Sequence, residues 1–179
     1  LTYAGLKRAV LSATATSSMV LLLAVTSNIF GAVFARMGSA NWITETLLAM
    51  PIPPVAMLVM VVALVFLLGW PFGWPAVILV FLPIFYPVMD GLKGVLAVSL
   101  DIPPDMLMVW FGTVVAVTLQ TAYLSPPVAM SAYYLKNVMP QWSLSTIYRG
   151  MGEFMIIQLI CLLAVMLWPE IALWLPRVV

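Results

Sequence analysis

Residues 69–75 read Gly-Trp-Pro-Phe-Gly-Trp-Pro and lie in the middle of a run without charged residues, 46–89. A straight helix over this run would extend about 66 Å, whereas the hydrocarbon core of a bilayer is only about 30 Å thick. Prolines and glycines at this density interrupt a regular helix. The arms Val55–Leu68 and Ala76–Val88 are too short for a full span. The sequence therefore predicts a re-entrant helical hairpin over about residues 54–89, or a pair of half-helices.

The composition indicates the class of protein. Hydrophobic residues make up 65% of the 179 residues and charged residues only 7%, and the mean hydropathy is +1.17. A soluble domain carries about a quarter charged residues, so a soluble protein is excluded. The apolar runs 9–35, 106–135 and 154–169 are continuous, whereas the strands of a membrane barrel alternate polar and apolar positions. The predicted fold class is therefore an all-α integral membrane protein, a multi-span helical bundle.

The chain is predicted to be a single transmembrane module over residues 1–179. Around the hairpin we expect a span over about 9–35, an amphipathic loop over 36–53, a polar link over 90–105, a broken span over about 106–135, an amphipathic linker over 136–153 and a last span over about 154–175. The interruptions in the hairpin and in the broken span carry the functional information, because a broken helix in a membrane exposes polar backbone groups.

Residue types that perform catalysis or bind transition metals are scarce. Histidine is absent and Cys161 is the single cysteine, which removes the commonest general base and the usual ligands of zinc, haem and iron–sulfur centres. No nucleophile is arranged with a base, so we predict no catalytic residue and no enzyme. The net charge of +1 gives no indication of a nucleic-acid partner. The partner that the composition does indicate is the lipid bilayer.

The second interruption is Ser-Pro-Pro at residues 125–127, near the centre of the run 106–135. Proline has no N–H, so this pair frees the carbonyls of Ala122 and Tyr123, and an orphaned carbonyl in hydrocarbon costs several kcal/mol. Small alkali cations bind such carbonyls and the hydroxyls nearby, and secondary transporters build ion and substrate sites where broken helices meet. The alternative interpretation is a simple proline kink in which serine and threonine hydroxyls bond back to the helix.

Four short motifs follow one another along the chain. Residues 69–76 (GWPFGWPA) correspond to the pattern G-M-F-x-D-x-x-A, residues 83–87 (PIFYP) to P-I-x-x-P, residues 121–129 (TAYLSPPVA) to G-L-L-T-P-P-V-G, and residues 169–176 (PEIALWLP) to P-x-L-x-x-W-L-P. With these motifs in this order, the chain resembles the C-terminal half of the large membrane (permease) subunit of tripartite ATP-independent periplasmic (TRAP) transporters. The resemblance covers nearly the whole chain.

The resemblance implies one repeat of a sodium-coupled, elevator-type transporter that imports small organic acid anions across the bacterial inner (cytoplasmic) membrane as a multi-pass protein. The implied partners are a periplasmic substrate-binding protein, a small membrane subunit and the missing N-terminal repeat. The implied coupling ion is sodium, and no other cofactor is expected. In the family, sodium is held between a hairpin tip and an unwound helix. Carried over to this sequence, the candidate sodium site comprises Gly69, Trp70 and Gly73 at the tip and Thr121, Ser125 and Pro126 opposite.

Two features depart from the family pattern. Gly73 stands where an acidic residue is common, and the chain begins at Leu1 with the length of only the second of two inverted repeats. We therefore expect a fragment or split half of a permease that is active when its other repeat is present. The alternative is a degenerate half-permease that serves as a structural transmembrane subunit of a larger membrane complex, for example a respiratory or photosynthetic one. The lost acid favours this alternative, whereas the intact break at Ser125 favours transport.

Overall fold

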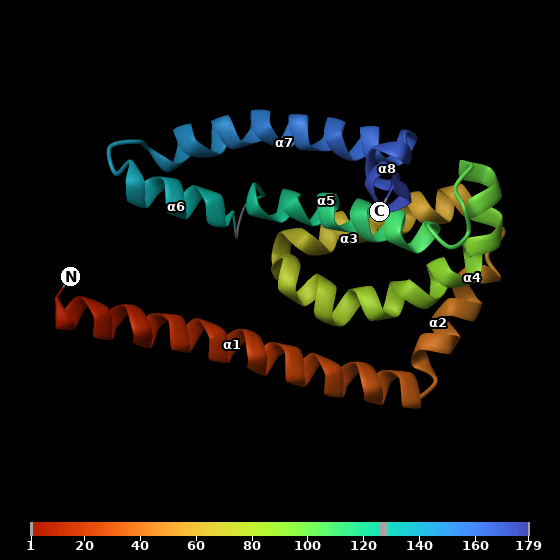
Figure 1. Ribbon diagram of the computed structural model, residues 1–179, viewed down its shortest axis with the longest axis horizontal. Coiled ribbons are helices and arrows are strands. Elements are labelled where there is room, and N and C mark those ends of the chain that lie inside the picture. The colour runs from red at the N-terminus through yellow and green to blue at the C-terminus, as the bar shows by residue number, and fades with distance from the viewer. Residues whose placement is uncertain (1, 126–128, 179) are drawn as a thin grey trace.

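The computed structural model describes residues 2–125 and 129–178, and these ranges are helical without any β-strand (Figure 1). The all-α fold class is thereby confirmed. The elements are α1 (Tyr3–Arg36), α2 (Ser39–Leu48), α3 (Pro54–Ala76), the π-helix η1 (Val77–Phe81), α4 (Leu82–Leu100), α5 (Leu107–Gln120), the 3-10 turn η2 (Thr121–Tyr123), α6 (Met130–Val138), α7 (Leu144–Leu167) and α8 (Glu170–Val178). In the described ranges, Pro54–Leu100 and Leu144–Leu167 are long and apolar enough to cross a membrane, and a shorter apolar helix covers Leu107–Tyr123.

The helical hairpin turns at one residue. α3 leads into the turn, and η1 and α4 lead away from it (Figure 1). Within α3 only Gly73 has non-helical dihedral angles, φ 72° and ψ 167°, so the helix continues through residues 69–72, which we expected to be irregular. Pro71 lies inside this helix; its ring fixes φ near the helical value, but it has no N–H to donate to the carbonyl of Leu67. Pro75 lies in the first turn after the break, where its missing N–H leaves no helical bond unmade.

The predicted polar link over 90–105 is mostly helix. α4 continues to Leu100, and only residues 101–106 form the connection to α5. Asp90 illustrates why: this exposed residue lies within α4, and a charge on the outer face of a helix does not end the helix. The helix ends instead at Asp101, whose backbone is left-handed with φ 54°, a conformation that commonly terminates helices.

The expected broken span consists of α5, η2 and α6. The helical hydrogen-bonding pattern of α5 changes at Thr121 to that of a 3-10 turn, which ends at Tyr123. Pro126 and Pro127 lie outside the described residues. The backbone of Ala129, on their other side, has φ 19° and ψ 60°, so the chain enters α6 from a non-helical residue. The interruption is therefore present on both sides of the proline pair.

The linker between α6 and the last long helix is shorter than the range 136–153 that we expected. Only residues 139–143 connect α6 to α7. The Ser143 hydroxyl caps α7 by accepting the backbone N–H of Thr146 at 3.1 Å, and such a cap allows a helix to begin before its apolar stretch. α7 ends at Leu167, and α8 follows after Pro169 as a separate short helix, so the last span predicted over 154–175 is divided in two.

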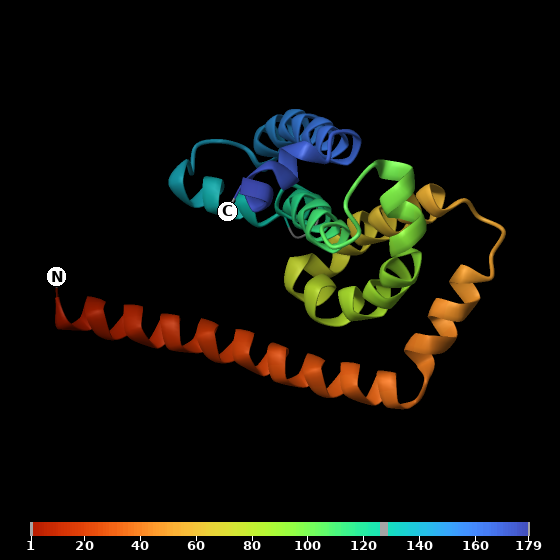
Figure 2. The ribbon, with the colours of Figure 1, turned by 45° about the vertical axis from the view of Figure 1, so that its right-hand side comes forward.

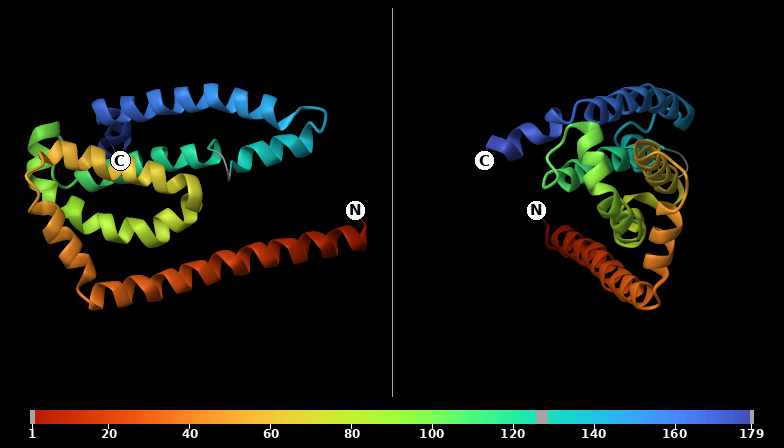
Figure 3. Two further views of the ribbon diagram at one scale, coloured as in Figure 1. Left: turned by 180° about the vertical axis from the view of Figure 1, so that it is seen from behind. Right: turned by 90° about the vertical axis from the view of Figure 1, so that its right-hand side faces the viewer.

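The core lies between α3, α4, α5, α7 and α8. Its largest fully buried side chain is Trp110, in the first turn of α5. α1 extends along the outside of the bundle, where it contacts α2 and η1 (Figures 2 and 3). Large apolar side chains on α1, such as Leu22 and Ile29, are more than half exposed. An exposed apolar surface of this kind suits a helix that faces lipid or further protein segments.

Candidate functional site

The hairpin tip packs against the interruption between α5 and α6. The ring of Trp74, just after the hairpin turn, stacks on the ring of Tyr123 in η2, with the ring centroids 6.5 Å apart and the planes inclined by 24°. On the other side of the turn, a Cβ added to Gly69 would lie 3.6 Å from the Cβ of Ala122. The absence of a side chain at Gly69 therefore permits close approach of the two elements. The two helix breaks that the sequence predicts meet in space.

Gly73 has a backbone conformation that other residues rarely adopt. Its φ of 72° and ψ of 167° belong to a region that is almost restricted to glycine. Space is not the constraint, because the nearest atom to an added Cβ would be Pro75 Cδ at 3.8 Å. Glycine at this position thus allows the helix to turn within one residue, and it leaves the tip without the charge that a carboxylate would bring.

Two buried hydroxyls lie on the broken helix opposite the tip. The side chains of Thr121 and Ser125 belong to residues that are 1% and 0% exposed. Thr121 Oγ1 donates to the carbonyl of Thr118 at 2.6 Å, and Ser125 Oγ donates to the carbonyl of Thr121 at 2.6 Å. Both hydrogens are used, but each hydroxyl oxygen keeps lone pairs that can accept. The interruption therefore presents neutral, hard oxygen atoms in an apolar setting.

The predicted site residues are only partly brought together. Gly69 and Gly73 are buried at the tip, and Thr121 and Ser125 are buried on the broken helix. Trp70 is 38% exposed, and its ring packs edge-on against Phe66 of the same helix, with centroids 5.4 Å apart. Trp70 therefore joins the outer face of α3 rather than the junction. Pro126 lies outside the described residues.

Two aromatic residues at the junction were absent from the predicted site. Trp74 and Tyr123 make the ring contact that joins the tip to the broken helix. Each lies within three residues of a predicted interruption, next to Gly73 or before the Ser-Pro-Pro motif. The sequence alone does not single them out, because Trp70 and Phe72 also lie within three residues of Gly73.

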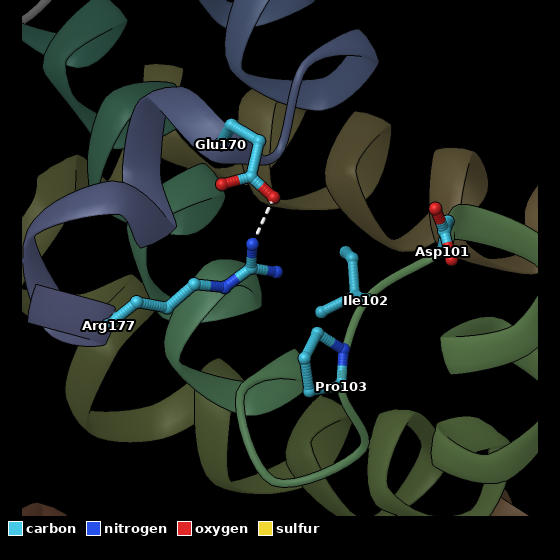
Figure 4. A pocket seen from close by; sticks show the side chains of 5 residues that line it. All are labelled: Asp101, Ile102, Pro103, Glu170 and Arg177. Atoms are coloured by element: carbon cyan, nitrogen blue, oxygen red, sulfur yellow. Dashed lines mark hydrogen bonds and ion pairs between the residues drawn. The ribbon is translucent and has the colours of Figure 1, made fainter.

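Charged groups gather elsewhere on the molecule. An open cavity of about 460 Å³ lies between the loop 101–106 and α8, and it is lined by Asp101, Ile102, Pro103, Glu170 and Arg177 (Figure 4). Arg177 forms an ion pair with Glu170 within α8, so its charge is neutralised. In the described part of the chain, no cluster of three or more histidine, cysteine or acidic side chains is arranged to hold a metal ion. The oxygen atoms described at the junction are those of the Thr121 and Ser125 hydroxyls and of backbone carbonyls.

Comparison with known proteins places the sequence among membrane transporters. Residues 1–171 match the family described as "Tripartite ATP-independent periplasmic transporter, DctM component". The sialic acid TRAP transporter permease protein SiaT of Haemophilus influenzae (strain 86-028NP) is 25% identical over 177 residues, which cover 99% of this chain and 27% of that protein. The chain thus spans about a quarter of the length of this relative. No solved structure gives a significant match.

Proposed function

Because the chain belongs to the DctM component family of tripartite ATP-independent periplasmic transporters, we propose that it forms the second repeat of a sodium-coupled transporter. The complete transporter would import small organic acid anions across the bacterial inner membrane, with a periplasmic binding protein. The relative SiaT is named for sialic acid, and that name supports an organic acid as the substrate class. A membrane permease is a transport protein, and the proposal needs no catalytic group.

The contact between the hairpin tip and the broken helix is the observation that carries this proposal. Discontinuous helices that meet within a membrane are the usual setting of ion and substrate sites in secondary transporters. Such interruptions are costly in hydrocarbon unless the freed backbone groups find partners. Here the two interruptions touch through Trp74 and Tyr123, and again through Gly69 and Ala122. A bound ion at this junction would satisfy oxygens on both elements.

Sodium suits the chemistry of the junction. A small alkali cation binds neutral oxygen ligands, and the hydroxyl oxygens of Thr121 and Ser125 are buried with lone pairs available. Gly73 contributes no carboxylate, so the ion would be held by dipoles alone, with further backbone carbonyls from the tip. A site without a fixed negative charge is expected to bind sodium weakly enough to release it in each transport cycle.

The proposed partners would complete the substrate site and the transporter. The remaining repeat of the permease would form the opposite wall of the substrate site, and a small membrane subunit and the periplasmic binding protein would complete the transporter. The exposed apolar surface of α1 (Tyr3–Arg36) is available to lipid or to such membrane segments. This assignment of partners rests on the family, whose description names a tripartite transporter.

One observation favours a second function. The buried hydroxyls of Thr118, Thr121 and Ser125 all donate to carbonyls of their own helical segment, as they would in a kink with a purely structural role. Together with the missing acid at Gly73, this arrangement fits a degenerate half-permease that serves as a structural subunit of a larger membrane complex.

Two measurements distinguish these functions. The first is gentle purification from the native membrane, followed by mass spectrometry of the proteins that accompany the chain in stoichiometric amount. Other permease segments, a small membrane subunit or a periplasmic binding protein are expected. Recovery of an unrelated complex, such as a respiratory or photosynthetic assembly, would exclude sodium-driven uptake as the function.

The second measurement is the sodium dependence of organic acid uptake. Replacement Ser125→Ala removes a buried oxygen at the junction, and we expect the sodium concentration for half-maximal uptake to rise about tenfold. Ser99→Ala is the matched control, because Ser99 also donates to a helical carbonyl, at 2.8 Å, but lies exposed on α4. An equal response of both variants would contradict a sodium site at Ser125.

A further inference from the structure

Gln158 of α7 reaches across to the broken helix at the point where its hydrogen-bonding pattern changes. The side-chain amide nitrogen of Gln158 donates to the backbone carbonyl of Val117 at 3.0 Å and to Oε1 of Gln120 at 3.1 Å. An amide nitrogen carries two hydrogens, so both are used. Gln158 is also the one amide side chain in the apolar run 154–169. Through these two bonds, α7 presents a hydrogen-bonding side chain to α5 from a stretch whose other residues are almost all apolar.

The Val117 carbonyl needs this donor because of the change in helix type. In a continuous α-helix the N–H of Thr121 would bond to the carbonyl of Val117. The Thr121 N–H is directed instead to the carbonyls of Thr118 and Leu119, as the chain tightens into the turn η2. A carbonyl left without a donor in an apolar setting costs several kcal/mol. The Gln158 amide takes the place of the missing backbone donor.

We propose that Gln158 is a positioning residue for the ion site. Gln158 holds the broken helix in the tightened conformation that places Thr121 and Ser125 opposite the hairpin tip. The bond to Val117 favours the 3-10 turn over a continuous α-helix, because it supplies a donor to a carbonyl that the turn deprives of the Thr121 N–H. Gln120, at the last helical position of α5, accepts the other hydrogen and fixes the orientation of the amide. Gln158 makes no contact with the ion in this scheme and acts through the backbone.

The role in sodium binding rests on the proposed function, whereas the effect on the turn does not, and the test separates the two. Hydrogen–deuterium exchange of the backbone amides in residues 118–125 reports the turn directly, in the purified membrane complex reconstituted in lipid nanodiscs. The variant Gln158→Met keeps the length of the side chain and the helix propensity but removes both donors. We expect exchange in residues 118–125 to rise about tenfold and the half-maximal sodium concentration for uptake to rise with it.

Two further variants make the result specific. Gln120→Met leaves the bond to Val117 in place, so it is expected to raise exchange less than Gln158→Met does. Because Gln120 is exposed, this variant also keeps the test available if Gln158→Met does not fold. Gln141→Met is the matched control, since Gln141 is an exposed amide in the linker after α6, and it is expected to change neither measurement.

The outcomes differ in what they overturn. Unchanged exchange in Gln158→Met, or a rise spread evenly over all helices, would refute the positioning role. Raised exchange in residues 118–125 with an unchanged sodium requirement would retain the effect on the turn but refute its connection to ion binding. Absence of sodium-dependent uptake in the unmodified complex would overturn the proposed function, and the exchange measurement would still decide whether Gln158 sets the turn.

Discussion

The indole Nε1 of Trp110 donates a hydrogen bond to the backbone carbonyl of Val165 at 3.0 Å and thereby joins the first turn of α5 to the last turn of α7. Trp110 is fully buried. Carbonyls in the last turn of a helix have no intrahelical donor, and the residue four positions after Val165 is Pro169, which has no N–H. One side chain thus satisfies its own buried donor and a carbonyl that the backbone cannot satisfy.

Loss of this bond is expected to destabilise the bundle. Replacement Trp110→Phe retains an aromatic ring but leaves the Val165 carbonyl without a donor, which costs about 1–3 kcal/mol of unfolding free energy, in addition to the smaller ring volume. Denaturant unfolding of the protein in detergent, followed by its helical circular dichroism signal, measures the change. Trp174→Phe is the control because Trp174 is 64% exposed, and an equal loss in both variants would contradict the role of the bond.

Gly73 and Gly94 are expected to respond in opposite directions to the same substitution. Gly73→Ala forces a side chain into a nearly glycine-specific conformation, φ 72° and ψ 167°, and is expected to cost about 1–3 kcal/mol. Gly94 lies within α4, where an added Cβ would meet nothing within 4 Å, so Gly94→Ala is expected to gain up to about 1 kcal/mol of helix stability. Thermal unfolding of the two variants measures both effects. A stable Gly73→Ala protein would show that the hairpin turn does not need the left-handed residue.

The sequence predicts the two interruptions well because their causes are local. A proline removes one N–H wherever it stands, and Gly73 supplies the backbone freedom that a one-residue turn requires. The sequence is less informative about where the helices end. Asp90 suggested a loop, yet α4 continues beyond it to Leu100, because an exposed charge is compatible with a helix and only the left-handed Asp101 ends it.

The contacts that join the interruptions could not be predicted from the sequence alone. Trp74 and Tyr123 belong to different helices, and so do Gln158 and Val117. Such pairs depend on how the helices pack, which the local pattern of residue types does not determine. The motifs of the family resemblance include Trp70 in the predicted site, and they do not indicate that its ring packs on Phe66 of its own helix. The orientation of a ring depends on how the helices pack, and a sequence motif does not determine that orientation.

The stacked rings at the hairpin tip are expected to stabilise the junction as a pair. A double-mutant cycle with Trp74→Leu, Tyr123→Leu and the combined variant isolates their interaction from the loss of each ring. For rings whose centroids are 6.5 Å apart we expect a coupling free energy of about 0.5–1.5 kcal/mol, measured by denaturant unfolding. The pair Trp74 and Trp42 is the control cycle, because Trp42 is 68% exposed on α2. Additive effects in the first cycle would indicate that the tip and the broken helix do not hold each other.

The single cysteine tests whether α7 crosses the membrane. Cys161 is exposed on α7, in a helix that is long and apolar enough to span a bilayer, so its exposed thiol is expected to face lipid. A membrane-impermeant maleimide is polar and does not enter the hydrocarbon core, so it reaches only those thiols that water also reaches. A membrane-impermeant maleimide should therefore label Cys161 slowly in intact membranes and readily after denaturation in detergent.

A cysteine outside the helix provides the comparison. In the double variant Cys161→Ala with Gln141→Cys, the thiol lies in the exposed linker 139–143, where water reaches it, and a permeabilised membrane preparation should be labelled rapidly. If Cys161 reacted as fast as this linker thiol, its face of α7 would line water or an aqueous cavity. The exposed apolar residues beside it, such as Ile157 and Ile160, would then require cover from another protein segment, because water does not solvate such a surface without cost.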